Sequence, residues 1–141
     1  MQETCHLTDE PAMLAYGAQL AECLRPGQAC FLSGPLGAGK TTLVRGLLRQ
    51  LGVRGPIRSP SFTLVEVYPF DDYDVFHFDF YRLDSKEQAL ALGLGDYFTP
   101  EAISLVEWPE RCAAYLPVPD YHCHIAFAEE SGREMKLEHR A

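Results

Sequence analysis

The chain lacks any run of eighteen apolar residues, so no membrane-spanning helix is expected. The first six residues are polar and have neither the basic start nor the apolar stretch of a secretory signal. We therefore expect a cytoplasmic protein. A length of 141 residues suits one compact domain with its own core, and we predict a single domain over residues 1–141.

The cysteines of the chain do not form a pattern that predicts disulfide bonds. The five cysteines are an odd number and none forms a C-x-x-C pair, so we expect reduced thiols and no zinc site of that kind. The segment His122-Cys123-His124 contains metal-binding residue types. Alternate residues of a strand share a face, which would leave Cys123 pointing away from both histidines. This pattern predicts a strand with a polar edge rather than a metal site.

Acidic residues are missing between positions 23 and 65, although the chain as a whole has a net charge of −8. A polyanion such as a nucleoside triphosphate suits this basic segment, whose positive field would speed its capture. The overall acidity argues against autonomous binding to nucleic acid, and contact with RNA is expected only within a larger complex. The six basic residues of the segment are Arg25, Lys40, Arg45, Arg49, Arg54 and Arg58.

The most informative pattern that is present is Gly34-Pro35-Leu36-Gly37-Ala38-Gly39-Lys40-Thr41, which matches G-x-x-x-x-G-K-[ST]. Its glycines allow successive backbone N–H groups to turn inward around phosphate oxygens. We expect Lys40 to contact the β- and γ-phosphates and Thr41 to offer its hydroxyl to Mg²⁺. The residues predicted to bind the nucleotide are Pro35, Leu36, Gly37, Ala38, Gly39, Lys40, Thr41 and Thr42.

The nucleotide is predicted to be ATP. Switch GTPases recognise guanine through an Asn-Lys-x-Asp segment, and this chain contains no asparagine.

Apolar spacing around the loop predicts an α/β fold. A helix is expected to begin at Thr8 or Asp9, a buried strand at 29–32 precedes the phosphate loop, and a second helix ends before Gly52. Residues 52–61 are rich in glycine and proline and predict a mobile loop. Further on we expect strands at 62–68 and 75–81 paired as a hairpin, a helix at 85–92, a buried strand at 103–107 and a hairpin of strands 121–128 and 133–138. The predicted architecture is a P-loop NTPase fold, with a mainly parallel central sheet flanked by helices and added antiparallel hairpins.

Two acidic residues end apolar strands, where they could serve a metal beside the phosphate loop. Asp79 follows residues 75–78 and Glu107 follows residues 103–106, the more continuously apolar segment. Mg²⁺ prefers oxygen ligands and neutralises the triphosphate. Either carboxylate could hold the ion, directly or through water.

Four motifs in order make the chain similar to one bacterial family. They are the phosphate loop 34–42, Ser59-Pro60-Ser61-Phe62-Thr63-Leu64-Val65-Glu66, His77-Phe78-Asp79-Phe80-Tyr81-Arg82-Leu83 and Leu105-Val106-Glu107-Trp108-Pro109. Together they resemble the TsaE family, also called YjeE. The resemblance extends to the opening helix and the closing hairpin, and so covers nearly the whole chain.

The resemblance implies a small ATPase required for N6-threonylcarbamoyladenosine at position 37 of tRNA. In the family it binds the TsaD–TsaB heterodimer, in which TsaD transfers the threonylcarbamoyl group. ATP hydrolysis by TsaE is thought to reset that complex between rounds, and TsaE alone is a weak ATPase. Contact with tRNA is thus expected only indirectly, through the complex.

By position, the resemblance makes Lys40, Asp79 and Glu107 the expected catalytic residues and Thr41, Glu107 and Asp79 the expected metal residues. Asp79 is implied to lie beside the metal or to orient water. Trp108 is implied to lie beside the nucleotide, with a core tryptophan as the alternative. The segment from Ser59 to Thr63 is implied to switch with nucleotide state.

The composition of the loop that contains this segment also favours a switch. Prolines hinged by glycines can close over a γ-phosphate and open after hydrolysis. Ser61 or Thr63 is expected to bond the phosphate or a water, with a plain turn hydroxyl as the alternative.

One position departs from the family, because Pro35 stands where the family usually has aspartate. Proline removes one N–H from the loop, but the amides of residues 37–41 remain. Nucleotide binding is therefore expected to survive, and whether this chain keeps any role of that aspartate is left open by the sequence.

Two other functions remain open on the sequence alone. A small-molecule kinase would also need an arginine-rich lid, and the basic residues after position 83 are few and scattered. A non-catalytic scaffold would use ATP binding alone to order its loop. For hydrolysis, Arg58 and Arg82 are candidates for a transition-state cation, and a partner is the alternative source.

Overall fold

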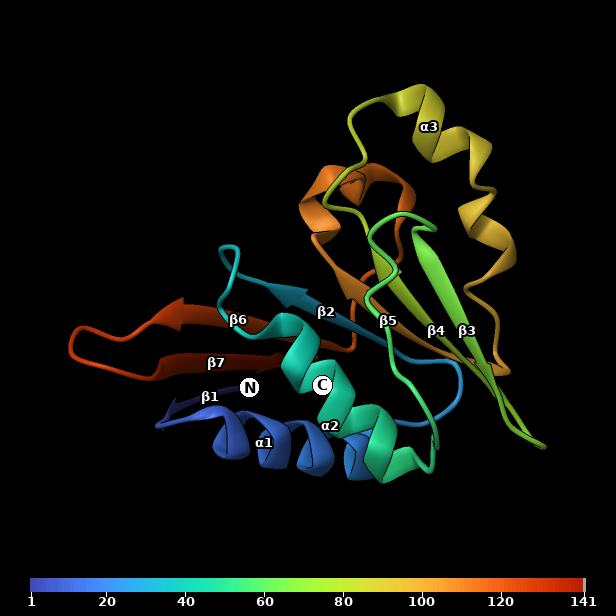
Figure 1. The fold of residues 1–141 in the computed structure, drawn as a ribbon. Coiled ribbons are helices and arrows are strands. Elements are labelled where there is room, and N and C mark those ends of the chain that lie inside the picture. Colours follow the sequence, from blue (N-terminus) through green and yellow to red (C-terminus); the bar gives the residue numbers. More distant parts are fainter. Residues whose placement is uncertain (141) are drawn as a thin grey trace.

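In the computed structural model, which describes residues 1–140, seven strands form one sheet in the order β1-β7-β6-β2-β5-β4-β3 (Figure 1). The strands are β1 (Gln2–Leu7), β2 (Ala29–Ser33), β3 (Val65–Pro69), β4 (Asp74–Asp79), β5 (Ala102–Glu107), β6 (Tyr121–Phe127) and β7 (Arg133–His139). The helices are α1 (Glu10–Cys23), α2 (Lys40–Leu51) and α3 (Lys86–Ala91), with 3₁₀ turns at Leu94–Asp96, Pro109–Arg111 and Ala113–Tyr115.

The centre of the sheet is parallel and its borders are antiparallel. Strands β6, β2, β5 and β4 run in one direction. The three pairs β3–β4, β6–β7 and β1–β7 are antiparallel. The predicted mainly parallel sheet with added hairpins is therefore confirmed. Because parallel strands end at the same edge, the carboxyl ends of β2, β5 and β4 meet there.

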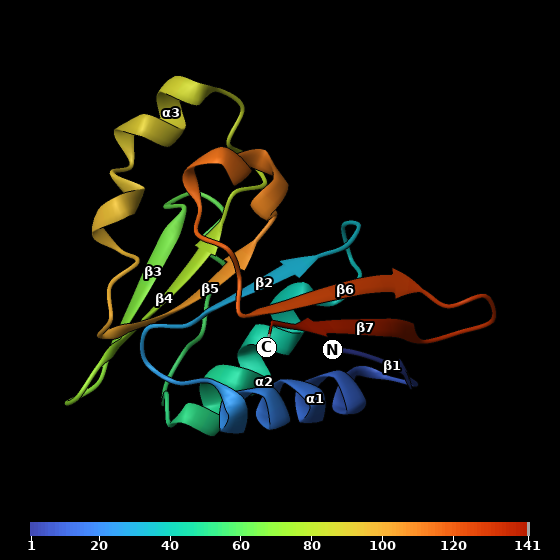
Figure 2. The same ribbon diagram turned by 180° about the vertical axis from the view of Figure 1, so that it is seen from behind.

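Helices α1 and α2 lie side by side over one face of the sheet (Figures 1 and 2). They cover an apolar cluster that extends from β4 to β1 across the sheet and includes Leu32, Leu105 and Met135. The helices approach closely at Gly46, where an added Cβ would lie 2.2 Å from the Leu14 carbonyl oxygen. Glycine is therefore required there by the close packing of two backbones.

The opposite face is covered over only part of its width. A second apolar cluster, which includes Phe78, Phe80 and Val106, packs β4 and β5 against α3 and the 3₁₀ turns. In Figure 2 these elements lie over the β3–β4–β5 side, whereas the β6–β7 hairpin extends away from them. The second face of β6 and β7 is thus left open.

Local signals explain most element boundaries. The Asp9 side chain accepts a hydrogen bond from the Ala12 backbone N–H at 3.0 Å and so caps α1, as predicted. Gly52 ends α2 in the left-handed conformation, with φ of 115°. The Ser85 hydroxyl caps α3 by accepting from the Gln88 N–H.

The structure corrects the sequence prediction in three places. The strand predicted at 75–81 ends at Asp79, because the chain turns after the carboxyl end of β4. Strand β1 was not predicted, because its side chains are mostly exposed and it is held by backbone pairing to β7 at the sheet border. The strand predicted at 62–68 begins only at Val65, because residues 61–63 form a turn and Phe62 is 83% exposed.

The cysteines are free thiols, as expected, and Cys30, Cys112 and Cys123 are buried. Among residues 1–140, we find no helix that is long and apolar enough to span a membrane.

Candidate nucleotide-binding site

The phosphate loop lies where it was predicted, between the carboxyl end of β2 and the first turn of α2. Gly37 and Gly39 have φ of 78° and 113°, a region that residues with a Cβ rarely adopt. These two conformations turn the loop back onto the helix. The start of α2 thereby aims its free N–H groups and the positive end of its dipole at the loop.

Lys40 is folded back onto the loop. Its ammonium donates hydrogen bonds to the carbonyl oxygens of Gly34 and, at 3.0 Å, Pro35. The same ammonium lies 4.2 Å from the ring centroid of Trp108. Burial lowers the pKa of Lys40, and the nearby carboxylates of Glu107 and Asp79 oppose that shift. A phosphate offers this cation stronger acceptors than two carbonyls do.

Glu107 meets the loop at the end of β5, the strand beside β2. The Thr41 hydroxyl lies 3.2 Å from both Glu107 carboxylate oxygens. The Glu107 side chain is nearly inaccessible, since the residue is 2% exposed. A hydroxyl and a carboxylate in contact at the end of a phosphate loop form an oxygen donor set that suits Mg²⁺.

His77 also holds Glu107, and the sequence analysis assigned it no role. Its Nε2 lies 2.6 Å from Glu107 Oε2, and the residue is 0% exposed. Within residues 1–140 its Nδ1 has no hydrogen-bond partner. The carboxylate can only accept, so Nε2 carries the proton and donates it. The sequence did offer one signal for this role: His77 lies two positions before Asp79, so the two side chains share a face of the strand.

Asp79 completes the edge of the site. It pairs with Glu107 in the parallel β4–β5 register. Its carboxylate accepts hydrogen bonds from the Tyr81 backbone N–H at 3.0 Å and the Ser59 hydroxyl at 3.3 Å. Burial is the largest influence and raises the pKa of Asp79, and the Tyr81 bond opposes it. The switch-like segment is thus tied to the acidic pair through Ser59.

These groups border a hollow of about 420 Å³ beside the loop. It brings together most of the predicted site residues, namely Leu36, Gly37, Gly39, Lys40, Thr41, Thr42, Ser59, Ser61, Asp79, Glu107 and Trp108. Pro35 is exposed and takes part through its carbonyl, while Thr63 is exposed on the turn. Arg82 also lines the hollow, with its guanidinium 4.6 Å from the Phe62 ring centroid.

Trp108 is half-buried, and it both lines the hollow and packs against the second apolar cluster. Its ring packs against Tyr81 with centroids 5.0 Å apart, and its backbone has a φ of 58°. A left-handed conformation is costly for a bulky residue and indicates that the surrounding structure imposes it. It turns the ring toward Lys40.

A second hollow, of about 280 Å³, lies on the other side of the loop. Ala38 and Thr42 line it together with the start of α1 and the β6–β7 turn. From β7, Arg133 donates through Nε to the Ala38 carbonyl at 3.0 Å and through Nη2 to the Gly37 carbonyl at 3.2 Å. The sequence analysis missed Arg133 as a loop contact, because sheet pairing alone brings the two segments together.

The P-loop NTPase fold is defined by three features of this site. They are a central parallel strand, a glycine-rich phosphate loop at its carboxyl end and a carboxylate on the adjacent strand. Comparison with known proteins narrows this class. Residues 7–136 match the family described as "Threonylcarbamoyl adenosine biosynthesis protein TsaE". The chain belongs to the TsaE family.

Similar proteins support that assignment over most of the chain. The tRNA threonylcarbamoyladenosine biosynthesis protein TsaE of Haemophilus influenzae is 38% identical over 133 residues, covering 91% of this chain and 84% of that protein. The protein of the same name from Bacillus subtilis is 34% identical, covering 79% and 69%. The crystal structure of Bacillus subtilis YdiB superposes with a TM-score of 0.85 at 28% identity, covering all of this chain and 87% of that one.

Proposed function

We propose that this chain is an Mg²⁺-dependent ATPase that acts with TsaD and TsaB in N6-threonylcarbamoyladenosine formation on tRNA. The observation that carries the proposal is the convergence of Lys40, Thr41 and Glu107 at the end of a phosphate loop. Family membership supplies the pathway, since the relatives are named for this modification.

ATP would lie across the loop, with its two ends in the two hollows. The γ-phosphate end belongs beside Glu107, where Lys40 leaves the loop carbonyls to meet it. The adenosine end belongs in the hollow beside Thr42 and Arg133. This orientation follows from charge, because the ammonium and the metal-binding oxygens all lie on one side.

Hydrolysis would use the acidic pair in two roles. Glu107 and Thr41 would hold Mg²⁺, whose charge stabilises the transferring phosphoryl group. Asp79 is restrained by two hydrogen bonds and would orient the attacking water. Arg82 is exposed and bound over Phe62, away from any fixed acceptor. If the partner supplies the transition-state cation, turnover by the chain alone would be weak.

The test measures phosphate release by the purified chain, alone and with purified TsaD–TsaB. We expect stimulation by the pair, and loss of turnover in Lys40→Ala and Glu107→Gln. Lys86→Ala is the matched control, since Lys86 is exposed on α3 and should leave turnover unchanged. ATP-dependent binding to the pair without turnover would instead favour a nucleotide-gated scaffold, and phosphate transferred to another molecule would indicate a kinase.

A further inference from the structure

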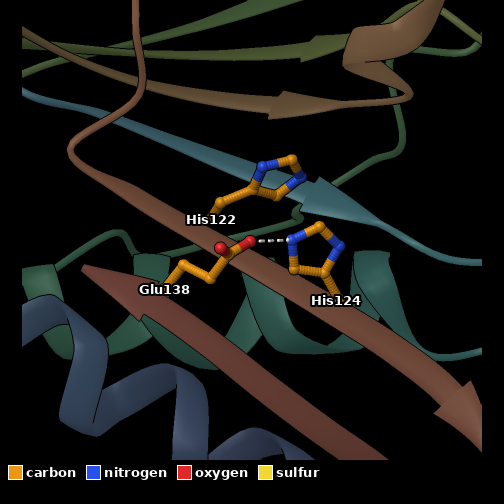
Figure 3. A group of neighbouring side chains, drawn as sticks. All are labelled: His122, His124 and Glu138. Carbon is orange, nitrogen blue, oxygen red and sulfur yellow. Dashed lines mark hydrogen bonds and ion pairs between the residues drawn. The ribbon is translucent and has the colours of Figure 1, made fainter. Parts of the chain in front are cut away.

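The open face of β6 and β7 carries a cluster of three side chains outside the nucleotide site (Figure 3). His122 and His124 lie two positions apart on β6, and Glu138 lies opposite His122 in the antiparallel register with β7. Cys123 points to the other face and is fully buried, as the sequence pattern predicted. We call His122, His124 and Glu138 the histidine cluster.

The three side chains of the histidine cluster converge. One possible ligand atom from each residue lies within 4.8 Å of those of the other two. His124 Nε2 is 2.6 Å from Glu138 Oε1, and the two imidazole rings stack with centroids 3.9 Å apart and planes 25° apart. Tetrahedral Zn²⁺ with ligands at about 2 Å separates its donor atoms by roughly 3.3 Å. The donor atoms would have to approach one another by up to about 1.5 Å, and one imidazole would have to turn out of the stack, for all three to bind one ion.

We propose that the histidine cluster binds a divalent transition-metal cation of the Zn²⁺ class. Imidazole nitrogen suits Zn²⁺, Cu²⁺ and Ni²⁺, whereas Mg²⁺ prefers oxygen ligands alone. The ion would take the place of the proton in the hydrogen bond between His124 and Glu138. It would also bind His122, which takes no part in that hydrogen bond. Three protein ligands leave one tetrahedral position for water or a partner's side chain.

The surroundings of the cluster support metal binding. His122 Nε2 lies 2.7 Å from the Ser33 hydroxyl, and its ring packs edge-on against Phe31 with centroids 5.7 Å apart. Metal-bound imidazoles are commonly oriented by a hydrogen-bonded partner of this kind. All three side chains are partly accessible, so an ion can reach them. The one cation opposite His124 is Lys136, which is exposed and can turn its ammonium to solvent.

The cluster is separate from the predicted magnesium residues, which allows the two sites to be tested apart. Ser33 ends β2 directly before the phosphate loop and faces the opposite side of the sheet from Leu32 and the α1–α2 layer. Glu107 lies on the α2 side. Excess Mg²⁺ would compete for the oxygen ligands at Glu107 but not for the imidazoles of the histidine cluster, and the cluster variants separate the two sites.

The experiment titrates Zn²⁺ into the purified full chain by calorimetry in the presence of excess Mg²⁺. We expect one Zn²⁺ per chain and an affinity at least about tenfold weaker in His124→Ala and in Glu138→Gln. Glu138→Gln keeps an oxygen that can accept from His124, so the strand pairing is preserved. His6→Ala is the matched control, because His6 is exposed on β1 and bonds the Ser131 carbonyl outside the cluster.

A second measurement guards against binding by the exposed Cys23 or other surface groups. The imidazole NMR signals of His122 and His124 should shift together on stoichiometric Zn²⁺, while those of His6 stay in place. Equal Zn²⁺ affinity in the wild type and both cluster variants, or shifts confined to other residues, would overturn the proposal.

Discussion

The two halves of the sheet differ in how many of their faces are covered. Strands β2, β5 and β4 are covered on both faces, and every residue of β5 is buried. Strands β6 and β7 are covered on one face only, so their buried and accessible residues alternate. The central strands thus bury few polar side chains, among them His77, Ser104 and Glu107, whereas the outer half leaves a whole face for polar groups.

Each half contains a histidine paired with a glutamate, and the two pairs differ in burial. His77 and His124 each bond a glutamate at 2.6 Å. His77 and Glu107 are buried, so water does not replace the hydrogen bond between them. The side chains of His124 and Glu138 are 39% and 45% exposed, so water can replace either partner. The buried pair should therefore stabilise the fold, whereas the accessible pair should be replaceable by water with little loss of stability.

Replacing His77 is expected to have the largest effect. His77→Leu removes the imidazole donor from the buried Glu107 carboxylate and leaves it with the longer contact to the Thr41 hydroxyl, which should lower the free energy of unfolding by about 2–4 kcal/mol. It should also reduce ATP turnover at least about a hundredfold, because Glu107 loses its orientation. Urea unfolding and phosphate release measure the two effects.

The matched variant in the outer half is His124→Leu. It should change the free energy of unfolding by less than about 1 kcal/mol and leave turnover intact. His77→Gln keeps a donor and should restore part of the lost stability. Equal losses in His77→Leu and His124→Leu would remove the distinction between the two halves.

Gly46→Ala tests the packing of α1 against α2. A Cβ 2.2 Å from the Leu14 carbonyl oxygen must push the helices apart, which should cost about 1–3 kcal/mol of stability. Gly95→Ala is the control, since no atom lies within 4 Å of its Cβ position. Thermal unfolding of both variants would show a lower melting temperature only for Gly46→Ala, and an unchanged one would contradict the close contact.

Arg133 links the two halves, because it holds the phosphate loop from β7. Arg133→Ala removes two hydrogen bonds to loop carbonyls and should weaken ATP binding about three- to tenfold, by roughly 1 kcal/mol. Lys136→Ala, on the same strand but exposed, should bind ATP normally. Trp108 fluorescence can follow the titration. An unchanged affinity in Arg133→Ala would show that the loop keeps its shape without β7.

The last prediction concerns pH. Burial, and secondarily His124, lowers the pKa of His122 to about 4 from an ordinary value near 6.5. Between these values the unfolded chain binds more protons at His122 than the folded one, so stability is lost as pH falls from about 6.5 to 4. His122→Gln should make this loss shallower by at most about 1.4 kcal/mol per pH unit. Urea unfolding across the window tests it, and an unchanged slope would contradict the assigned environment.

Much of the central half could be predicted from the sequence. The phosphate loop and the acidic strand ends depend on local patterns, and Lys40, Asp79 and Glu107 come together as expected. The β1 strand could not be predicted, because it is held by backbone bonds that carry no side-chain signal. Arg133 and the histidine cluster depend on the pairing of β7, which spacing along the chain does not reveal.

The proposed role predicts that ATP hydrolysis resets the modifying complex between rounds. The most direct measurement counts N6-threonylcarbamoyladenosine formed per TsaD–TsaB pair in a reconstituted reaction with tRNA and the threonylcarbamoyl adenylate. With the wild-type chain we predict many rounds, and with Lys40→Ala no more rounds than without the chain. Equal numbers of rounds with the wild-type chain and Lys40→Ala would contradict the account.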